Sequence, residues 1–302
     1  MTPGHAVLPI DLCFQGLPGV ITTYVITGDD GPVIIDPGPS STLPTLRAGL
    51  AAHGLDLRDV RHVVLTHIHL DHAGATGSIV HETGARVYVH ARGAPHLARP
   101  ERLMASAGQI YREHMHALWG EMRPVPPELI TALSGGEDVQ AGSVTLQAIA
   151  SPGHAVHHLA WQCAEHLFCG DAGGIRLEAA QTPRAPTPPP DINLEAWRES
   201  VARLRSRDAR VLHVAHAGSY TDPAAHWDAL LANMETDAQR VRSLLAAGAT
   251  LDEVTDDFTR QLEADLAGEG GDLAARMRFA SPAWMSVQGL ARYWQKREAR
   301  LD

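Results

Sequence analysis

Apolar and polar positions alternate in short blocks through the first two thirds of the chain and take a helical spacing in the last third. Apolar, β-branched runs predict strands at residues 20–27, 33–35, 60–66, 86–90, 144–150, 159–163, 167–169 and 211–215. Amphipathic helices are predicted at residues 43–50, 73–82, 104–119 and 195–207. This order of elements predicts an α/β core.

From residue 224 onward the pattern is helical, with predicted helices at 224–246, 251–266 and 286–300. We therefore expect an α/β domain over residues 1–223 and a helical C-terminal extension over residues 224–302. The extension is expected to pack over the mouth of the site or to form a homodimer surface, and residues 104–119 to serve packing or a dimer surface. The proline-rich segment 182–190 predicts a surface loop that crosses the core.

The composition narrows the classes of partner. A formal net charge of -10 argues against a nucleic acid or an anionic membrane as partner. No run approaches the roughly 20 apolar residues that span a bilayer, and residues 1–14, which lack Lys and Arg, do not resemble a signal peptide. The three cysteines form no CxxC pair, which is typical of a reducing compartment. We expect a cytoplasmic protein that acts on a small molecule.

Histidine is the unusual residue, with 18 in the chain. His67, His69, Asp71 and His72 directly follow the predicted strand 60–66, at the end of a strand where α/β sheets place their sites. Imidazole and carboxylate suit zinc or another divalent first-row metal. Because four side chains within six residues cannot converge on one ion, we expect two adjacent metals, with the first two ligands turned one way and the last two the other.

Further candidate ligands follow other predicted strands. His154 comes after a glycine, Asp171 likewise offers a carboxylate that can bridge two ions, and His216 lies where the strand at 211–215 ends. His213 is an alternative to His216.

Two further sets of polar residues accompany these ligands. One of the two residues His157 and His158 is expected to pack against or hydrogen-bond a ligand, and neither is expected to bind metal directly. Tyr220 is a candidate hydrogen-bond donor to a substrate oxyanion.

The order H-x-H-x-D-H, then a later His, an Asp and a last His, resembles the metallo-β-lactamase-fold superfamily over residues 20–220. The resemblance implies a four-layer αβ/βα sandwich, with the site at one edge of the facing sheets and the catalytic domain at 1–223. It also implies two metals, a nucleophilic hydroxide between them, and a role for Asp71 in orienting it or moving a proton. The implied ligands are His67, His69 and His154 for the first metal, Asp71, His72 and His216 for the second, and Asp171 as the bridge.

The complete ligand set resembles the thioesterase (glyoxalase II-like), lactonase and phosphodiesterase branches more than the zinc β-lactamases. We therefore expect a dinuclear hydrolase of a small ester, thioester or lactone, with zinc favoured and iron or manganese as alternatives. A glutathione-binding set of basic and Tyr residues is not evident, and the acidic balance counts against RNA processing. The alternatives are a phosphodiesterase, a mononuclear iron persulfide dioxygenase, a flavodiiron-like oxidoreductase, and a non-catalytic metal-binding module. The flavodiiron-like alternative is disfavoured because a flavodoxin region is missing. The non-catalytic module is disfavoured because no metal ligand of the family pattern is lost.

Overall fold

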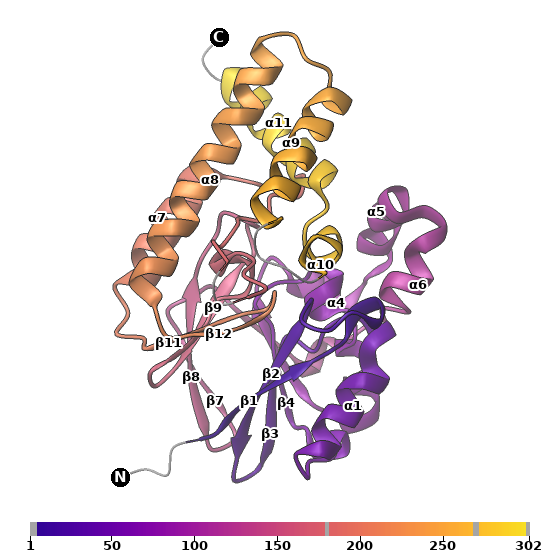
Figure 1. Ribbon diagram of the computed structural model, residues 1–302. Helices are drawn as coiled ribbons and strands as arrows, with labels where there is room; N and C mark the ends of the chain where they lie inside the picture. Colours follow the sequence, from indigo (N-terminus) through magenta and orange to yellow (C-terminus); the bar gives the residue numbers. More distant parts are fainter. Residues whose placement is uncertain (1–4, 179–180, 268–271, 300–302) are drawn as a thin grey trace.

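Two six-stranded mixed sheets form the centre of the protein, and helices cover their outer faces (Figure 1). The computed structural model describes residues 5–178, 181–267 and 272–299. The first sheet has the order of the chain: β1 (Val7–Asp11), β2 (Thr22–Gly28), β3 (Gly31–Ile35), β4 (His62–Val64), β5 (Arg86–His90) and β6 (Ile130–Leu133). Its first three strands are antiparallel, and β3 to β6 run parallel.

The second sheet has the reverse order, β12-β11-β10-β9-β8-β7. Its strands are β7 (Asp138–Ala141), β8 (Val144–Ala150), β9 (Leu159–Cys163), β10 (His166–Phe168), β11 (Val211–Val214) and β12 (Gly218–Tyr220). All neighbours are antiparallel except β10 and β11, which run parallel. A parallel pair needs a long crossover, and here it carries the proline-rich segment and α7 (Leu194–Arg205).

Alternate side chains of a strand face opposite layers. On β3, Val33 and Ile35 join the cluster between the two sheets, together with Trp161 of β9. The intervening Ile34 packs outward with Leu46 of α1 (Leu43–Ala52). The same alternation along β8 separates a layer between the sheets from a layer beneath the helices. The result is the four-layer α/β sandwich that the family resemblance implied.

The remaining helices of the core are short. They are α2 (Leu70–Ala73), α3 (Thr76–Thr83), α4 (Ala94–Ala98), α5 (Glu101–Tyr111) and α6 (Met115–Trp119). The prediction of one helix over residues 104–119 is wrong, because α5 and α6 are separated by a 3-10 turn at Arg112–His114. Arg112 has φ 47°, a left-handed conformation that interrupts an α-helix of L-residues.

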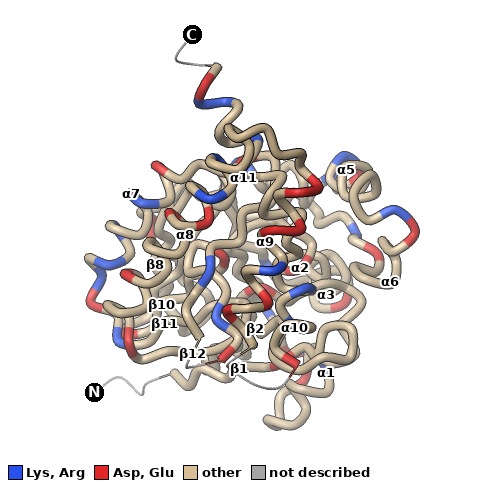
Figure 2. Tube along the Cα trace, turned by 45° about the horizontal axis from the view of Figure 1, so that its top comes forward, with Lys and Arg blue, Asp and Glu red and all other residues tan. Residues whose placement is uncertain are grey.

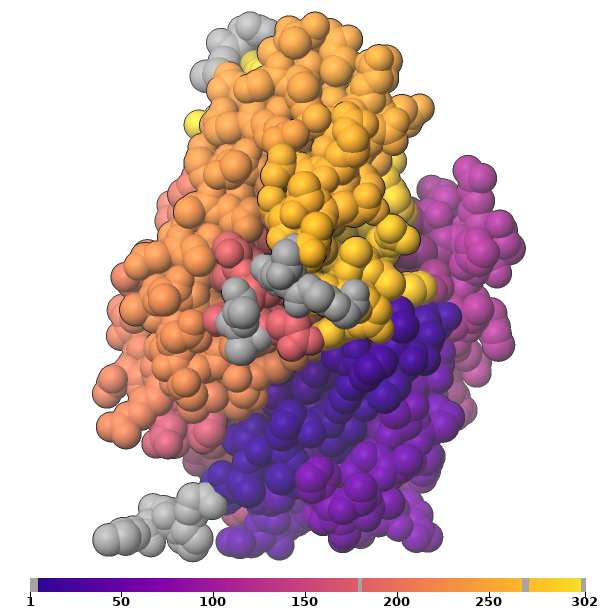
Figure 3. Space-filling model, viewed as in Figure 1, coloured from indigo at the N-terminus to yellow at the C-terminus, as the bar shows by residue number. Residues whose placement is uncertain are grey.

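The C-terminal extension consists of α8 (Pro223–Ala246), α9 (Leu251–Leu266), α10 (Leu273–Ala280) and α11 (Ala283–Glu298). Trp227 of α8 and Leu290 of α11 are buried in one cluster with the second sheet and α7. Leu262 of α9 and Met277 of α10 belong instead to the cluster of the first sheet. Figure 3 shows these helices resting on the N-terminal part of the chain. The extension therefore packs on both outer faces, and its status as a separate domain stays a prediction.

The proline-rich segment is irregular, as predicted, but it does not simply cross the surface. Pro183, Pro186 and Thr187 are buried. The Thr187 carbonyl approaches Gly289 of α11 so closely that a Cβ there would have no room. Packing of α11 over the segment thus corrects the expectation of a surface loop.

Acidic and basic side chains are interspersed along the chain trace (Figure 2). Among the described residues, no helix has the combination of length and apolarity that crossing a bilayer requires.

Candidate metal centre

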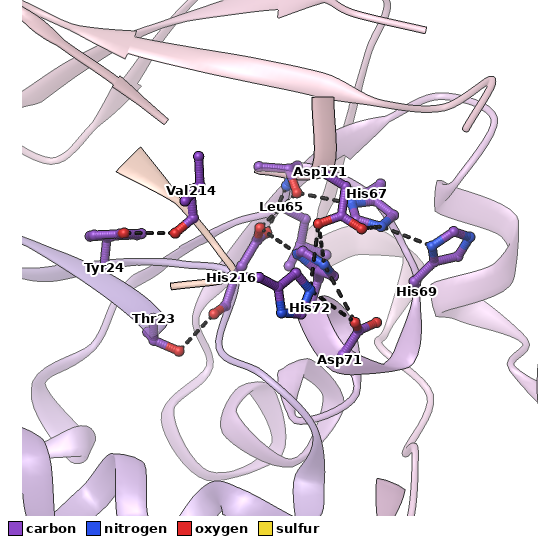
Figure 4. Close-up of polar contacts among 12 residues, drawn as sticks. Thr23, Tyr24, Leu65, His67, His69, Asp71, His72, Asp171, Val214 and His216 are labelled. Carbon is purple, nitrogen blue, oxygen red and sulfur yellow. Dashed lines mark hydrogen bonds and ion pairs between the residues drawn. The ribbon is translucent and has the colours of Figure 1, made fainter. Parts of the chain in front are cut away.

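All seven candidate ligands converge at one edge of the sandwich, although they come from four separate places in the chain. Figure 4 labels six of them, all except His154. His67 and His69 follow β4, Asp71 and His72 lie on α2, and His154 follows β8. Asp171 lies in a 3-10 turn after β10, and His216 follows β11. The site thus forms where the carboxyl ends of strands from both sheets meet.

One group of donors consists of His67, His69, His154 and Asp171, whose ligand atoms all lie within 4.8 Å of one another. Nδ1 of His69 is 2.9 Å from Nε2 of His67 and 2.9 Å from Nε2 of His154. Oδ2 of Asp171 is 3.2 Å from Nε2 of His154. Three imidazole nitrogens and one carboxylate oxygen therefore face a common point.

The second group consists of Asp71, His72 and His216. Oδ2 of Asp71 is 3.7 Å from Nε2 of His72 and 3.4 Å from Nε2 of His216. The other oxygen of Asp171, Oδ1, is 3.3 Å from His72 Nε2 and 3.6 Å from His216 Nε2. The two oxygens of Asp171 thus face different groups, which is the arrangement of a bridging carboxylate.

Hydrogen bonds on the outer side of the rings determine which nitrogen faces the centre. Nδ1 of His154 donates to the Pro186 carbonyl at 2.9 Å, and Nδ1 of His216 donates to the Val20 carbonyl at 2.8 Å. A carbonyl only accepts, so Nδ1 carries the proton in both rings. In a neutral ring, Nε2 then presents its lone pair to the centre, as a metal ligand must.

Asp36 fixes two more rings. Its Oδ2 accepts from Nδ1 of His72 at 2.9 Å and from the Thr66 hydroxyl at 2.6 Å. Because that hydroxyl donates to Asp36, its oxygen accepts from Nδ1 of His67, 3.0 Å away. The backbone N–H of Thr66 also donates to Asp36 Oδ1, at 2.7 Å. One buried carboxylate thereby aligns a ligand of each group, His67 and His72.

Two glycines make room for this packing. Gly153 has φ 147°, and a Cβ there would collide with Trp197, whose ring lies edge-on to that of His154. Gly170 has φ 48°, and a Cβ would lie 2.6 Å from the Thr66 hydroxyl and 2.8 Å from His158 Nε2. The residue before each of these two ligands therefore has to be small.

Burial and neighbouring charges shift the pKa values of several ligands in opposite directions. Burial, together with neighbouring imidazoles, lowers the pKa of His67 and lowers that of His69 to about 3. Burial alone would lower the pKa of His72 as well, but Asp171, Asp71 and Asp36 raise it well above its usual value. Burial would raise the pKa of Asp71, yet His72 and His216 lower it to about 2. The carboxylates thus stay ionised and attract positive charge to the centre.

This donor set fits divalent metal ions. Neutral imidazoles and ionised carboxylates are the ligands that zinc and other first-row metals take. Nε2 of His72 and Oδ1 of Asp171 are buried and, within the described residues, accept no hydrogen bond from a neighbour. Two unsatisfied buried atoms that face each other are expected where a cation belongs.

The remaining polar candidates lie outside the two groups. Nε2 of His213 contacts Nδ1 of His166 at 2.9 Å, away from the ligands. His158 stacks on His67 with ring centroids 5.1 Å apart and hydrogen-bonds Ser151, so it supports a ligand, as the sequence suggested. Tyr220 does not reach the ligands, because its hydroxyl donates to the Arg176 carbonyl.

Sequence reasoning missed Asp36 and Thr66. Asp36 follows the strand β3, as His154, Asp171 and His216 follow theirs, and Thr66 precedes the first ligand. A polar residue at the end of a buried strand was therefore the signal that pointed to Asp36.

A cavity of about 360 Å³ opens beside the ligands. Its floor contains four of them, His69, Asp71, His154 and Asp171. Its walls come from α5, α6, the proline-rich segment and the α10–α11 region, and Tyr111 and Trp119 are among the lining residues. The C-terminal extension therefore does cover the site, as expected from its amphipathic pattern.

Fold and donor set together define an α/β sandwich protein with two adjacent His/Asp clusters that could hold metal ions. The family model described as "Metallo-beta-lactamase superfamily" matches residues 16–216, more than half of the chain. The chain therefore belongs to the metallo-beta-lactamase superfamily.

Individual relatives agree with this assignment. The "Metallo-beta-lactamase fold-containing protein ST1585" of Sulfurisphaera tokodaii is 28% identical over 67% of this chain and 74% of its own length. A "Hydroxyacylglutathione hydrolase" of Albidiferax ferrireducens is 29% identical over 51% of this chain, and the match spans only 49% of that relative. In structure, the metallo-beta-lactamase family protein TTHA1429 of Thermus thermophilus superposes with a TM-score of 0.71 at 23% identity, over 98% of this chain and 95% of that one.

Proposed function

We propose that the protein is a dinuclear metal-dependent hydrolase that cleaves a small ester, thioester or lactone. The observation that carries the proposal is the orientation of Asp171, whose two oxygens face two separate sets of imidazoles. The matched relatives that are named hydroxyacylglutathione hydrolase, a name that denotes hydrolysis of an acyl compound, support a carbonyl substrate.

His67, His69 and His154 would hold one ion, and Asp71, His72 and His216 the other, with Asp171 shared. Zinc suits this mixed nitrogen and oxygen set, and iron and manganese are the alternatives. Bound divalent ions supply water that ionises near neutral pH and polarise the substrate oxygen.

The chain itself contributes orientation and proton transfer. The hydrogen bonds that the ligand rings donate on their outer side, to Pro186, Val20 and Asp36, keep the rings in place. The Asp71 side chain is 22% exposed whereas that of Asp171 is 5% exposed, and both line the cavity. We assign Asp71 the transfer of the proton that attacking water would release, since it is the more exposed of the two carboxylates that line the cavity.

Metal analysis and a substrate panel test this function. Purified protein is expected to hold two divalent ions per chain and to cleave at least one member of a panel of esters, thioesters, lactones and phosphodiesters. Chelation should abolish turnover and added Zn²⁺ should restore it. A single iron with oxygen uptake on a persulfide would instead support the dioxygenase alternative, and turnover that survives removal of the metals would contradict the proposal.

A further inference from the structure

The walls of the cavity differ in chemistry from its floor. Above the ligands, the cavity is lined by aliphatic and aromatic side chains, among them Leu103, Leu118, Trp119, Phe279, Trp284 and Met285. These residues come from two parts of the chain, 103–119 and 279–285, that are far apart in the sequence, so the apolar character is not the property of one helix. A volume of about 360 Å³ is within the range of small-molecule sites.

Charge is nearly missing from these walls. Within the described residues that line the cavity, Arg278 is the one charged side chain above the floor. Its guanidinium is already paired with Glu263, with Nη2 2.8 Å from Oε1. A substrate with carboxylates on its distal part would therefore meet one cation on these walls, an exposed arginine that already has a carboxylate partner, and would lose hydration elsewhere.

The apolar lining continues to the surface. Ile110 of α5 and Phe279 of α10 both line the cavity and are 39% and 40% exposed. Two of the large apolar side chains that the protein leaves in contact with water thus lie on the walls of this cavity. Exposed apolar groups grouped at a cavity are typical of a binding site for an apolar ligand.

We propose that the cavity binds a linear apolar acyl chain of the substrate, so that the enzyme acts on esters, thioesters or lactones of hydrophobic acids. This inference rests on the proposed function for its chemistry but concerns the walls, not the metals. The acyl carbonyl would lie over the ligands, and the chain would extend between α5, α6 and the α10–α11 region.

Chain-length dependence of binding is the first test, and it needs no turnover. Acetamide, butanamide, hexanamide and octanamide are titrated into the purified protein, with intrinsic tryptophan fluorescence as the signal, since two of the six tryptophans, Trp119 and Trp284, line the cavity. Affinity is expected to rise about fourfold per added methylene, because each one leaves water for an apolar wall. Affinity that does not rise from acetamide to octanamide overturns the proposal.

Hydrolysis of p-nitrophenyl acetate, butyrate, hexanoate and octanoate is the second test. The value of kcat/KM is expected to rise along the series, mainly through a falling KM. Hydrolysis with kcat/KM that is flat or falls overturns the acyl-chain proposal and leaves the hydrolase function standing. If no substrate of the wider panel is cleaved, the hydrolase function fails, and the amide titration alone decides whether the cavity binds an apolar chain.

A matched pair of substitutions locates the effect. Ile110→Glu places a charge on the cavity wall, and Leu251→Glu makes the same change at an equally exposed position, 43%, outside the cavity. The first substitution is expected to lower the affinity for octanamide about tenfold and to leave the affinity for acetamide within twofold. The reason is that a bound long alkyl chain would remove water from the new carboxylate, whereas acetamide has no such chain. The second is expected to change neither by more than twofold. Equal effects of both substitutions on octanamide binding would overturn the proposal.

Discussion

The floor and the walls of one cavity follow different physical rules. At the floor and directly beneath it, five of the seven ligands are buried and two are half-buried. Most of the histidines have a second hydrogen bond that fixes the ring, such as those of His154 to Pro186 and His72 to Asp36. On the walls, side chains such as Ile110 and Phe279 pack without polar partners and reach the solvent. Directional bonds therefore fix the floor, whereas the walls depend on the packing of helices. The two should respond differently to substitution.

The largest effect is expected on the floor, from Asp171→Asn. The amide keeps the shape but removes the charge and one of the oxygens that face the two groups. Since metal-ion catalysis contributes several kcal/mol and each 1.36 kcal/mol is tenfold, we expect kcat to fall about a thousandfold. Metal content should fall as well, as measured by elemental analysis. Asp252→Asn, at an exposed position of α9, is the control. Full metal content with kcat within tenfold would contradict a bridging role.

A substitution of a buried residue beneath the cavity walls is expected to change the free energy of unfolding instead of metal binding. Met277 is buried where α10 packs on the first sheet, so Met277→Ala is expected to cost about 2–5 kcal/mol of unfolding free energy through the cavity it leaves. Urea denaturation measures this loss, and metal bound per folded chain should not change. Leu251→Ala, at an exposed position, should cost less than about 0.5 kcal/mol. If Met277→Ala cost as little, the extension would not be part of the core.

The smallest of the three effects is expected from Asp36→Asn, which sharpens the description of the floor. Asparagine tolerates the left-handed conformation at this position, φ 51°, but its NH2 cannot accept from Thr66 or His72. Loss of an outer hydrogen bond to a metal ligand typically costs about 10–100-fold in metal affinity or activity. Competition with a chelator measures the affinity. Asp29→Asn, in the exposed β2–β3 turn, is the control, and equal affinities of the two variants would show that Asp36 does not position the ligands.

The elements with a strong local pattern were predictable. β5 at residues 86–90 and α9 at residues 251–266 lie where the sequence placed them, since their periodicity is uninterrupted. β1, β7 and β12 and the helix α10 had no comparable signal. Such short strands are defined by the neighbour they pair with, so their pattern alone carries little information. The break at Arg112 likewise depends on one backbone conformation that the amphipathic pattern hides.

By itself, the sequence determined the chemistry of the floor. Ligand types, their close spacing from His67 to His72 and the glycines before His154 and Asp171 are local properties, and a metal site restricts them severely. Only the tertiary structure decided which atoms face each other and what surrounds them. It turned Tyr220 toward Arg176, brought Asp36 behind two ligands, and assembled the apolar walls from segments far apart in the sequence. The reason is that the sequence pattern of apolar residues is the same whether they lie in a core, at an interface or on a cavity wall. Only the packing of the folded chain distinguishes these three environments.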